Sequence, residues 1–590
     1  LGADAGRASR SADPASTACR EAFEEPHLKV TSMNSMTVAQ YALSRLAQLG
    51  IDRIFGVPGD YAFAIDDAAE KVPGLSWVAC ANELNAAYAA DGYARVRGAA
   101  ILSTTYGVGE LSALNGVMGS RAHRLPVFHL VGMPSERIQR LGLLTHHNLG
   151  DTVYDRFQAL SGAACCVSTN LTPDNCIDEM ERVTREALRQ SLPAYIVISE
   201  VNGEMPVLGT PVKGRKLSAV KRQASVATEL DAAVATLLAR IAAARNPVAI
   251  VTHLVARYGV ADKAAQFIEK SNLPFALMPN DKGTLDESMP QYMGLYGGIW
   301  SSSPAVCAAV EAADLIVDVG GLLTHELNTG MWTSVPKSER IVSIRDNWVR
   351  VGDKVFLNVA IDDVLAALVA KVPARKGANP VKVEQLPMVG KGDEKLSTDA
   401  FYPRLQRALR RGDTLVIETG SCMTRLNRMT LPAGVSAEGQ GLWGSIGWAT
   451  PACLGVEMAK TTGRTVMVTG DGSHQLTLNE LGVMGRYKTK PIIFVLNNGL
   501  YGVEDVISER GHPYDDLAKL NYHLLPQAFG CDGWLALKVA TVAELEAAFA
   551  KIATHDGAAY IEVMIPETES QPLSEKIIDN AYKVKTPPAG

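Results

Sequence analysis

Two polar residues, Asp471 and Asn498, have types and surroundings that suit metal chemistry. Asp471 lies in the tripeptide GDG, directly after an apolar run that ends at Thr469, and Asn498 follows a second apolar run that begins at Pro491. A carboxylate and an amide oxygen, with a backbone carbonyl just beyond, are hard ligands that suit Mg2+. The glycines and a helix start offer N–H groups to phosphate. These residues predict a metal ion that holds a diphosphate.

The elements around the two candidate ligands would bring them together at one sheet edge. The two apolar runs predict buried strands, GDG predicts a turn, and a helical pattern lies between the strands. Thr477 followed by Glu480 predicts a capping box at the start of that helix. A strand–helix–strand unit forms a right-handed crossover, so both strands are parallel and end at the same edge, where such sheets bind ligands. We therefore expect Asp471 and Asn498 to be adjacent in space.

A second group of ionisable residues lies far upstream. Asp60 ends a predicted strand in GVPGDY, Glu83 begins a predicted helix in ACANELNAAYAADGYAR, and His146 and His147 are adjacent in LLTHHNLGD. Each has a simple structural explanation: a turn aspartate, an acid that complements a helix dipole, and an exposed histidine pair. On an extended segment the two histidines would point in opposite directions, so we expect no metal bound by both.

The composition is that of a globular α/β enzyme. The 590 residues are 47% hydrophobic and 20% charged, and this length predicts roughly three domains. A net charge of -6 gives no basic field, so we expect no nucleic acid partner. No apolar run approaches the ~18 residues of a membrane span, and we expect no membrane association. Nine cysteines without CxxC spacing favour free thiols and a cytoplasmic location.

Alternating strands and helices predict an α/β protein with three doubly wound parallel-sheet domains. We expect a flexible leader at 1–35, domains at 36–203, 222–372 and 395–570, and a C-terminal tail at 571–590. Stretches rich in Pro, Gly and Lys separate the domains. No GxGxxG follows a strand of the middle domain, so no independent nucleotide site is expected there.

The GDG and NN motifs, at this interval, resemble the thiamine diphosphate motif of the 2-oxo acid decarboxylases, in the pyruvate and indolepyruvate decarboxylase branch. The resemblance runs from about Thr37 to about Ile565 and includes NELNAAYAADGYAR around Glu83, TTYGVGELSALNGVMGS at 104–120, and WGSIG ahead of GDG. It implies thiamine diphosphate and Mg2+ as cofactors, with a pyrimidine-binding, a middle and a diphosphate-binding domain. Acetolactate synthase relatives can hold FAD in the middle domain, but we expect none here.

The resemblance also implies the roles of individual residues. Glu83 would bond to the pyrimidine nitrogen of the cofactor, and Asp60, His146, His147 and Glu504 would move protons as one coupled group during aldehyde release. The residues implied to contact the cofactor are Thr419, Gly420, Gly444, Ser445, Ile446, Gly470, Asp471, Gly472, Ser473, Asn498 and Leu500. Of these, Asp471, Asn498 and the backbone carbonyl of Leu500 would bind Mg2+.

Some positions differ from the family pattern. Leu500 stands where the family usually has glycine, but the metal would need only the backbone carbonyl of this residue. Gly502 stands where the family often has threonine, and the sequence offers no reason for this replacement. Val503 and Met423 stand where pyruvate-specific relatives tend to carry a larger isoleucine and a tryptophan. Because smaller or more flexible side chains enlarge a pocket, we expect bulky aromatic or branched substrates (indolepyruvate, phenylpyruvate or 2-oxoisovalerate), with pyruvate accepted.

The sequence thus predicts non-oxidative decarboxylation of a 2-oxo acid to an aldehyde and CO2. In the family, the acid of one subunit meets the metal site of another, so a homodimer or a dimer of dimers with active sites at the interface is expected. Two alternatives remain open. An acetolactate synthase-like carboligase would share Glu83 and the metal site but lack the histidine pair and Glu504, and a non-catalytic member of the fold would keep the architecture alone.

Overall fold

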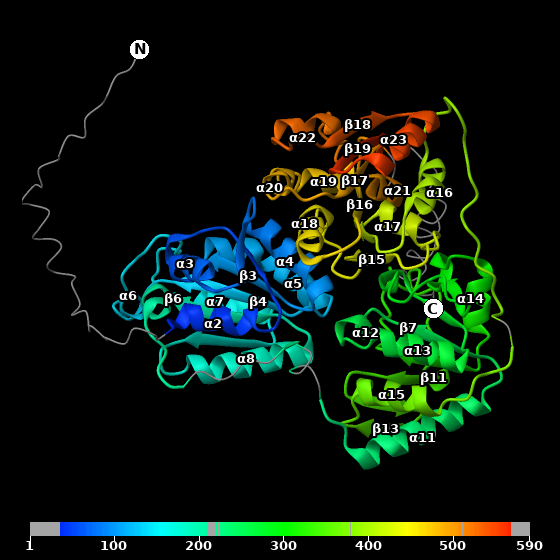
Figure 1. The fold of residues 1–590 in the computed structure, drawn as a ribbon, viewed down its shortest axis with the longest axis horizontal. Coiled ribbons are helices and arrows are strands. Elements are labelled where there is room, and N and C mark those ends of the chain that lie inside the picture. Colours follow the sequence, from blue (N-terminus) through cyan, green and yellow to red (C-terminus); the bar gives the residue numbers. More distant parts are fainter. Residues whose placement is uncertain are drawn as a thin grey trace, which may run out of the picture. The chain divides into compact units, whose positions relative to one another are not determined.

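The computed structural model describes residues 36–210, 216–217, 220, 223–377, 379–508 and 511–567. These residues build three sheets with flanking helices, which we call the N-terminal, middle and C-terminal units (Figure 1). The predicted leader at 1–35 and tail at 571–590 lie outside the described residues. Within the described part of the chain, no helix has both the length and the apolar character needed to cross a bilayer.

The N-terminal unit contains a six-stranded, fully parallel sheet in the order β2-β1-β3-β4-β6-β5. Its strands are β1 (Arg53–Gly56), β2 (Ser76–Ala79), β3 (Ala100–Thr105), β4 (Val127–Met133), β5 (Val167–Leu171) and β6 (Ala194–Ser199). Its helices are α2 (Val38–Ala47), α3 (Phe63–Lys71), α4 (Glu83–Arg97), α5 (Val108–Ala122), α6 (Glu136–Arg140), α7 (Asp155–Ala163), α8 (Cys176–Gln190) and α9 (Glu200–Glu204). Strands β3, β4 and β6 are buried along their whole length, as near-continuous apolar runs require.

The middle unit differs from our prediction at one edge of its sheet. The order is β13-β12-β11-β10-β7-β8-β9, and the β11–β12 and β12–β13 pairs are antiparallel. A two-residue loop with Gly352 at φ +59 joins β12 to β13, and a loop this short cannot make a parallel crossover. The strands are β7 (Pro247–Val251), β8 (Phe275–Leu277), β9 (Tyr292–Leu295), β10 (Leu315–Val319), β11 (Ile341–Ile344), β12 (Trp348–Val351) and β13 (Lys354–Leu357), with helices α11 (Ala227–Ala243), α12 (Leu254–Arg257), α13 (Ala261–Ser271), α14 (Pro304–Glu311) and α15 (Ile361–Lys371).

The C-terminal unit contains a six-stranded parallel sheet in the order β15-β14-β16-β17-β19-β18. Its strands are β14 (Thr414–Ile417), β15 (Ser436–Gly439), β16 (Thr465–Gly470), β17 (Ile492–Asn497), β18 (Leu535–Val539) and β19 (Ala559–Met564). Its helices are α16 (Thr398–Ala408), α17 (Ser421–Leu426), α18 (Ala449–Ala459), α19 (Asp471–Gln475), α20 (Glu480–Arg486), α21 (Gly502–Ile507), α22 (Leu525–Ala528) and α23 (Val542–Thr554). Because β16 and β17 are paired neighbours, the two predicted metal ligands leave the sheet at the same edge.

Two local predictions in this region were wrong. GDG is not a free turn, because Asp471 is the first residue of α19. Thr477 and Glu480 do not form a capping box: α20 begins at Glu480 itself, and the Thr477 hydroxyl donates to the carbonyl of Gly447. The carboxylate of Glu480 turns away from its own helix and contacts the N-terminal unit. Tertiary partners have replaced the local ones that the sequence pattern suggested.

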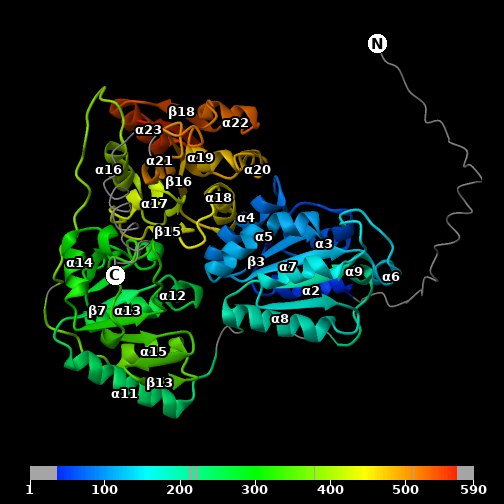
Figure 2. The same ribbon diagram turned by 180° about the vertical axis from the view of Figure 1, so that it is seen from behind.

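Helices α4 and α18 join the N-terminal and C-terminal units through backbone contact, and they lie side by side in both views (Figure 1 and Figure 2). A Cβ on Gly92 would lie 2.2 Å from the carbonyl oxygen of Ala452, and one on Gly455 would lie 1.9 Å from that of Ala89. Glycine is therefore required at both positions. Beside this contact, the buried Asp91 accepts hydrogen bonds from Arg95, Ser120 and Trp448.

Candidate active site

The ends of β16 and β17 carry the predicted metal ligands, which we call the metal corner (Asp471, Asn498 and the Leu500 carbonyl). One terminal amide atom of Asn498 lies 3.1 Å from both Asp471 Oδ1 and the Leu500 carbonyl oxygen. If that atom is nitrogen, it donates to both. If it is oxygen, three oxygens converge on one point, which a cation would stabilise. The donor set therefore fits Mg2+.

The backbone holds the carboxylate of Asp471 in place. Gly472 N–H donates to Oδ1 at 3.0 Å, and Gly499 N–H donates to Oδ2 at 2.7 Å. Burial raises the pKa of Asp471 to about 6, against these backbone hydrogen bonds, which lower it. A buried carboxylate with this raised pKa lacks a compensating positive charge, and a bound divalent ion would supply one.

The metal corner opens into a cavity of about 570 Å3. Nearly all predicted cofactor contacts line it: Thr419, Gly420, Gly444, Ile446, Gly470, Asp471, Gly472, Ser473, Asn498 and Leu500, together with Glu504. Ser445 does not line it, and its hydroxyl instead hydrogen-bonds Tyr88 at 2.6 Å. At Gly470 and Gly444 no atom lies within 4 Å of the place a Cβ would occupy, so both border open space. The cavity thus fits a diphosphate-bearing cofactor.

Sequence reasoning missed part of the cavity wall. Trp300, at the end of a short 3-10 helix (Gly298–Trp300), Met331, between β10 and β11, and the segment 565–567 after β19 also line it. No motif surrounds these residues, and only the folding of the middle unit against the C-terminal unit brings them to the site. Met423 and Val503 line the same cavity, so both sit where they can set its size.

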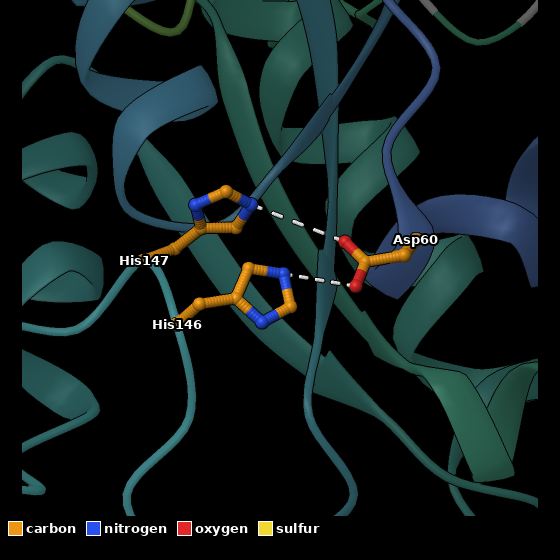
Figure 3. Close-up of side chains that lie close together, drawn as sticks. All are labelled: Asp60, His146 and His147. Atoms are coloured by element: carbon orange, nitrogen blue, oxygen red, sulfur yellow. Dashed lines mark ion pairs between the residues drawn. The ribbon is translucent and has the colours of Figure 1, made fainter.

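The N-terminal unit carries a separate group of ionisable side chains, the acid–base cluster (Asp60, His146 and His147). His146 Nε2 lies 2.9 Å from Asp60 Oδ2, and His147 Nε2 lies 3.9 Å from Oδ1 (Figure 3). The expectation that the two histidines point in opposite directions was wrong. They lie in a turn with His147 at φ +66, and their rings are 4.3 Å apart. A turn reverses the alternation that an extended segment would impose.

Glu83 lies beside this cluster at the start of α4. The start of α5 separates them: a Cβ on Gly109, in the first turn of α5, would lie 3.3 Å from Glu83 Oε1, and a Cβ on Gly107, just before α5, would lie 2.5 Å from the His147 carbonyl oxygen. Burial, then the charge of His146, lowers the pKa of His147, while the charges of Asp60 and Glu83 raise it. The four groups are close enough for their charges to influence one another.

Within one chain, the acid–base cluster and the cavity do not form a single site. Of the described residues that line the cavity, none belongs to the N-terminal unit. The acid–base cluster is instead accessible to solvent, with the Asp60 side chain 47% exposed. The structure therefore brings together the predicted metal ligands and Glu504 in one place, and Asp60, Glu83 and the two histidines in another.

Exposed apolar side chains lie around both places. The loop that carries His146 and His147 exposes Leu141, Leu144 and Leu149, by 60%, 61% and 67%. Leu476, directly after α19, and Ile507, on the cavity wall, are exposed by 52% and 44%. Apolar side chains gathered on a surface mark a place where another surface docks.

Comparison with known proteins identifies the family. Residues 36–158, 234–370 and 418–563 match the N-terminal TPP binding domain, the central domain and the C-terminal TPP binding domain of thiamine pyrophosphate enzymes. An alpha-keto-acid decarboxylase of Mycobacterium leprae is 35% identical over 90% of this chain and 93% of its own length. A pyruvate decarboxylase of Candida glabrata is 36% identical over 87% of this chain and 92% of its own length.

A solved structure shares the fold. It is described as a putative thiamin diphosphate-dependent enzyme from Mycobacterium smegmatis, and it matches with a TM-score of 0.73 at 22% identity over 90% of this chain and 100% of that one. The three-unit α/β architecture is therefore that of thiamine diphosphate enzymes, in which Mg2+ is the usual metal. The chain belongs to this family and is a thiamine diphosphate-dependent 2-oxo acid decarboxylase.

Proposed function

We propose that the chain removes CO2 from a bulky 2-oxo acid, aromatic or branched, at active sites that two copies of the chain build together. One observation carries the shared active site: each chain holds a metal corner with a cavity and an acid–base cluster that lies outside that cavity. Two copies in a closed dimer would complete two identical sites, as closed symmetry favours.

Residues of the C-terminal unit would hold the cofactor. Asp471, Asn498 and the Leu500 carbonyl would bind Mg2+, and the start of α19 would offer its N–H groups to the diphosphate. Gly444 and Ile446, which line the cavity, would contact the rings of the cofactor. Thiamine diphosphate supplies the electron sink that loss of CO2 requires.

Residues of the N-terminal unit of the second copy would move protons. Glu83 would hold a proton at the pyrimidine nitrogen, and His146 and His147 would exchange protons through Asp60, whose two carboxylate oxygens face their Nε2 atoms. The lowered pKa of His147, caused by burial and by His146, keeps it neutral and able to accept a proton near neutral pH. Glu504 would face this group from the cavity wall of the first copy.

The exposed apolar side chains support the same arrangement. Docking of the loop that carries Leu141, Leu144 and Leu149 near the cavity of another copy would bury them and exclude water from the acid–base cluster. Leu476 and Ile507 offer apolar surface on the receiving side.

The choice of a bulky substrate rests on Met423 and Val503, which line the cavity. A flexible thioether and a small branched side chain leave room that larger residues would fill. Rates on pyruvate, phenylpyruvate, indolepyruvate and 2-oxoisovalerate test this choice, and a preference for pyruvate would contradict it. Acetolactate formed in excess of aldehyde would instead favour the carboligase alternative.

Mixed oligomers test whether the active sites are shared. A Glu83→Gln chain and an Asp471→Ala chain are each expected to be inactive alone. After mixing, a shared site predicts that activity returns to about one quarter of wild type, because half of the dimers are mixed and each holds one intact site. Sites built within single chains would give no recovery.

A further inference from the structure

The carboxylate of Glu480, the first residue of α20, leaves its own unit and contacts the N-terminal unit of the same chain. Glu480 Oε2 accepts from the Ala81 N–H at 3.2 Å and from the Asn85 amide at 2.8 Å. The Asn85 amide also donates to Asn479 Oδ1 at 3.0 Å. The thiol of Cys80 lies beside the same carboxylate, whose charge raises the pKa of that thiol further after burial has raised it.

These contacts surround the turn that carries Glu83. Asn82 caps α4, its side chain accepting from the Asn85 N–H at 2.8 Å, and Glu83 is the first residue of the helix. Ala81, before Glu83, and Asn85, after it, therefore both donate hydrogen bonds to Glu480. The direction in which the Glu83 side chain leaves α4 depends on this turn.

Burial of the Glu480 carboxylate is unfavourable in free energy. Glu480 is completely buried, burial raises its pKa, and among the described residues its Oε1 has no hydrogen-bond partner. A buried polar atom without a partner costs free energy that an apolar side chain would not cost. As an acid in the first turn, Glu480 complements the dipole of α20, but it forms no capping box there.

We propose that Glu480 is a positioning residue for Glu83 of its own chain, holding the turn that aims the Glu83 carboxyl into the active site of the partner. The inference rests on the proposed function, because it assumes that Glu83 serves a site whose metal corner belongs to the second copy. The segment from Asp471 to Glu480 then connects the metal corner of one active site to the acid of the other. Glu480 touches no cofactor and acts only through the turn.

Hydrogen exchange of the cofactor-free protein tests the structural part. In Glu480→Ala, the backbone amides from Cys80 to Asn85 should exchange about tenfold faster, because the turn loses two hydrogen bonds to the carboxylate. Glu480→Gln should restore slow exchange, since its amide oxygen can still accept both. Glu457→Ala is the matched control. Among the described residues Glu457 accepts a hydrogen bond only from the Lys490 N–H, so this substitution should leave exchange in the peptide from Cys80 to Asn85 unchanged. Unchanged exchange in Glu480→Ala would overturn the proposal.

Turnover gives the second readout. Glu480→Ala should lower kcat by about 10–100-fold, as small displacements of a catalytic group do, while Mg2+-dependent binding of thiamine diphosphate keeps its wild-type Kd. Glu480→Gln should keep kcat within about threefold of wild type, because its amide oxygen can still accept the two hydrogen bonds. A similar loss of kcat in both variants would contradict this. A weakened cofactor Kd with unchanged kcat would assign Glu480 to its own metal corner instead, and would overturn the proposal.

Mixed dimers decide which active site Glu480 serves. In a dimer of a Glu480→Ala chain with an Asp471→Ala chain, one site should be fully intact. In a dimer of a wild-type chain with a chain that carries both substitutions, the metal corner of the wild-type chain is intact. The Glu83 that serves it comes from the substituted chain and lacks its Glu480, so turnover at this site should be lowered. The reverse pattern would overturn the proposal. If Glu83→Gln and Asp471→Ala chains do not complement each other, the shared site itself is wrong, which separates the two failures.

Discussion

The amide of Asn498 lies 3.1 Å from Asp471 Oδ1, although two helices, α19 and α20, and the strand β17 lie between the two residues in the chain. Their meeting follows from the parallel pairing of β16 and β17, which delivers both side chains to one sheet edge. The Leu500 carbonyl oxygen lies 3.1 Å from the same terminal amide atom of Asn498. The metal corner is thus built by the fold before any ion arrives, and its properties can be tested directly.

Replacement of Asp471 by alanine should abolish Mg2+-dependent binding of thiamine diphosphate. The variant removes the only carboxylate of the metal corner, and hard divalent ions depend on such oxygens. Calorimetric titration of the cofactor with and without Mg2+ checks this. Asp532→Ala, which removes an exposed acid of the same unit, should bind as wild type. Wild-type affinity in Asp471→Ala would contradict the metal assignment.

Replacement of Glu83 by glutamine should leave cofactor binding intact and lower kcat by about 10²–10⁴-fold, the usual effect of losing a general acid or base. The reason is that glutamine keeps the shape of the side chain but cannot exchange a proton. Steady-state kinetics combined with a cofactor titration separates the two effects. Turnover equal to wild type would remove Glu83 from the mechanism.

Enlarging two cavity side chains should shift substrate preference toward pyruvate. Met423 and Val503 line the cavity, and Met423→Trp combined with Val503→Ile would fill space that a bulky side chain of the substrate needs. We expect kcat/KM for phenylpyruvate to fall by about 10–100-fold relative to that for pyruvate, the range that pocket shape controls. An unchanged ratio would show that other residues set the preference.

Gly92→Ala should destabilise the protein strongly, because a Cβ there would lie 2.2 Å from the Ala452 carbonyl oxygen. Separating α4 from α18 would cost about 1–3 kcal/mol or more. Gly482→Ala is the matched control, since it lies in α20 and its nearest neighbour would be 3.5 Å away. That substitution should be neutral or stabilising by up to about 1 kcal/mol. Thermal unfolding of both variants decides the matter.

Asp66→Asn should change how stability depends on pH. Burial raises the pKa of Asp66 to about 7, while hydrogen bonds from Ser103 and Gly59 lower it. A carboxyl with a raised pKa stabilises the fold at low pH, and this contribution is lost as the pH rises from about 4 through 7. The variant should therefore gain about 1–3 kcal/mol relative to wild type between pH 5 and pH 8. Denaturant unfolding of the variant and the wild type at pH 5 and pH 8 checks this. A difference in unfolding free energy between the two proteins that is the same at both pH values would contradict it.

The sequence predicted those features that follow from strand order and chain direction. Asp471 and Asn498 meet as expected because alternating buried strands and helices leave few arrangements of a parallel sheet. The three-unit α/β fold was predicted on the same grounds. The edge strands β12 and β13 were not predicted as an antiparallel pair, since they are short and partly exposed and carry a weak apolar pattern.

Features that depend on tertiary contacts were predicted less well. His146 and His147 were expected to point apart, but the left-handed conformation of His147 turns both rings toward Asp60. Glu480 matched a local capping pattern, yet its carboxylate bonds to Ala81 and Asn85, which lie some 400 residues away in the chain. Sequence spacing along one helix carries no information about such partners.

The backbone contact between α4 and α18 bears on how activity would depend on protein concentration if two copies share each active site, as we propose. Gly92 and Gly455 let α4 and α18 approach to backbone contact, and in this arrangement none of the described residues that line the cavity comes from the N-terminal unit of the same chain. Under the proposed shared site, a working active site needs a second copy of the chain. Dilution below the association threshold should silence turnover while every chain stays folded, and restoring the concentration should bring it back.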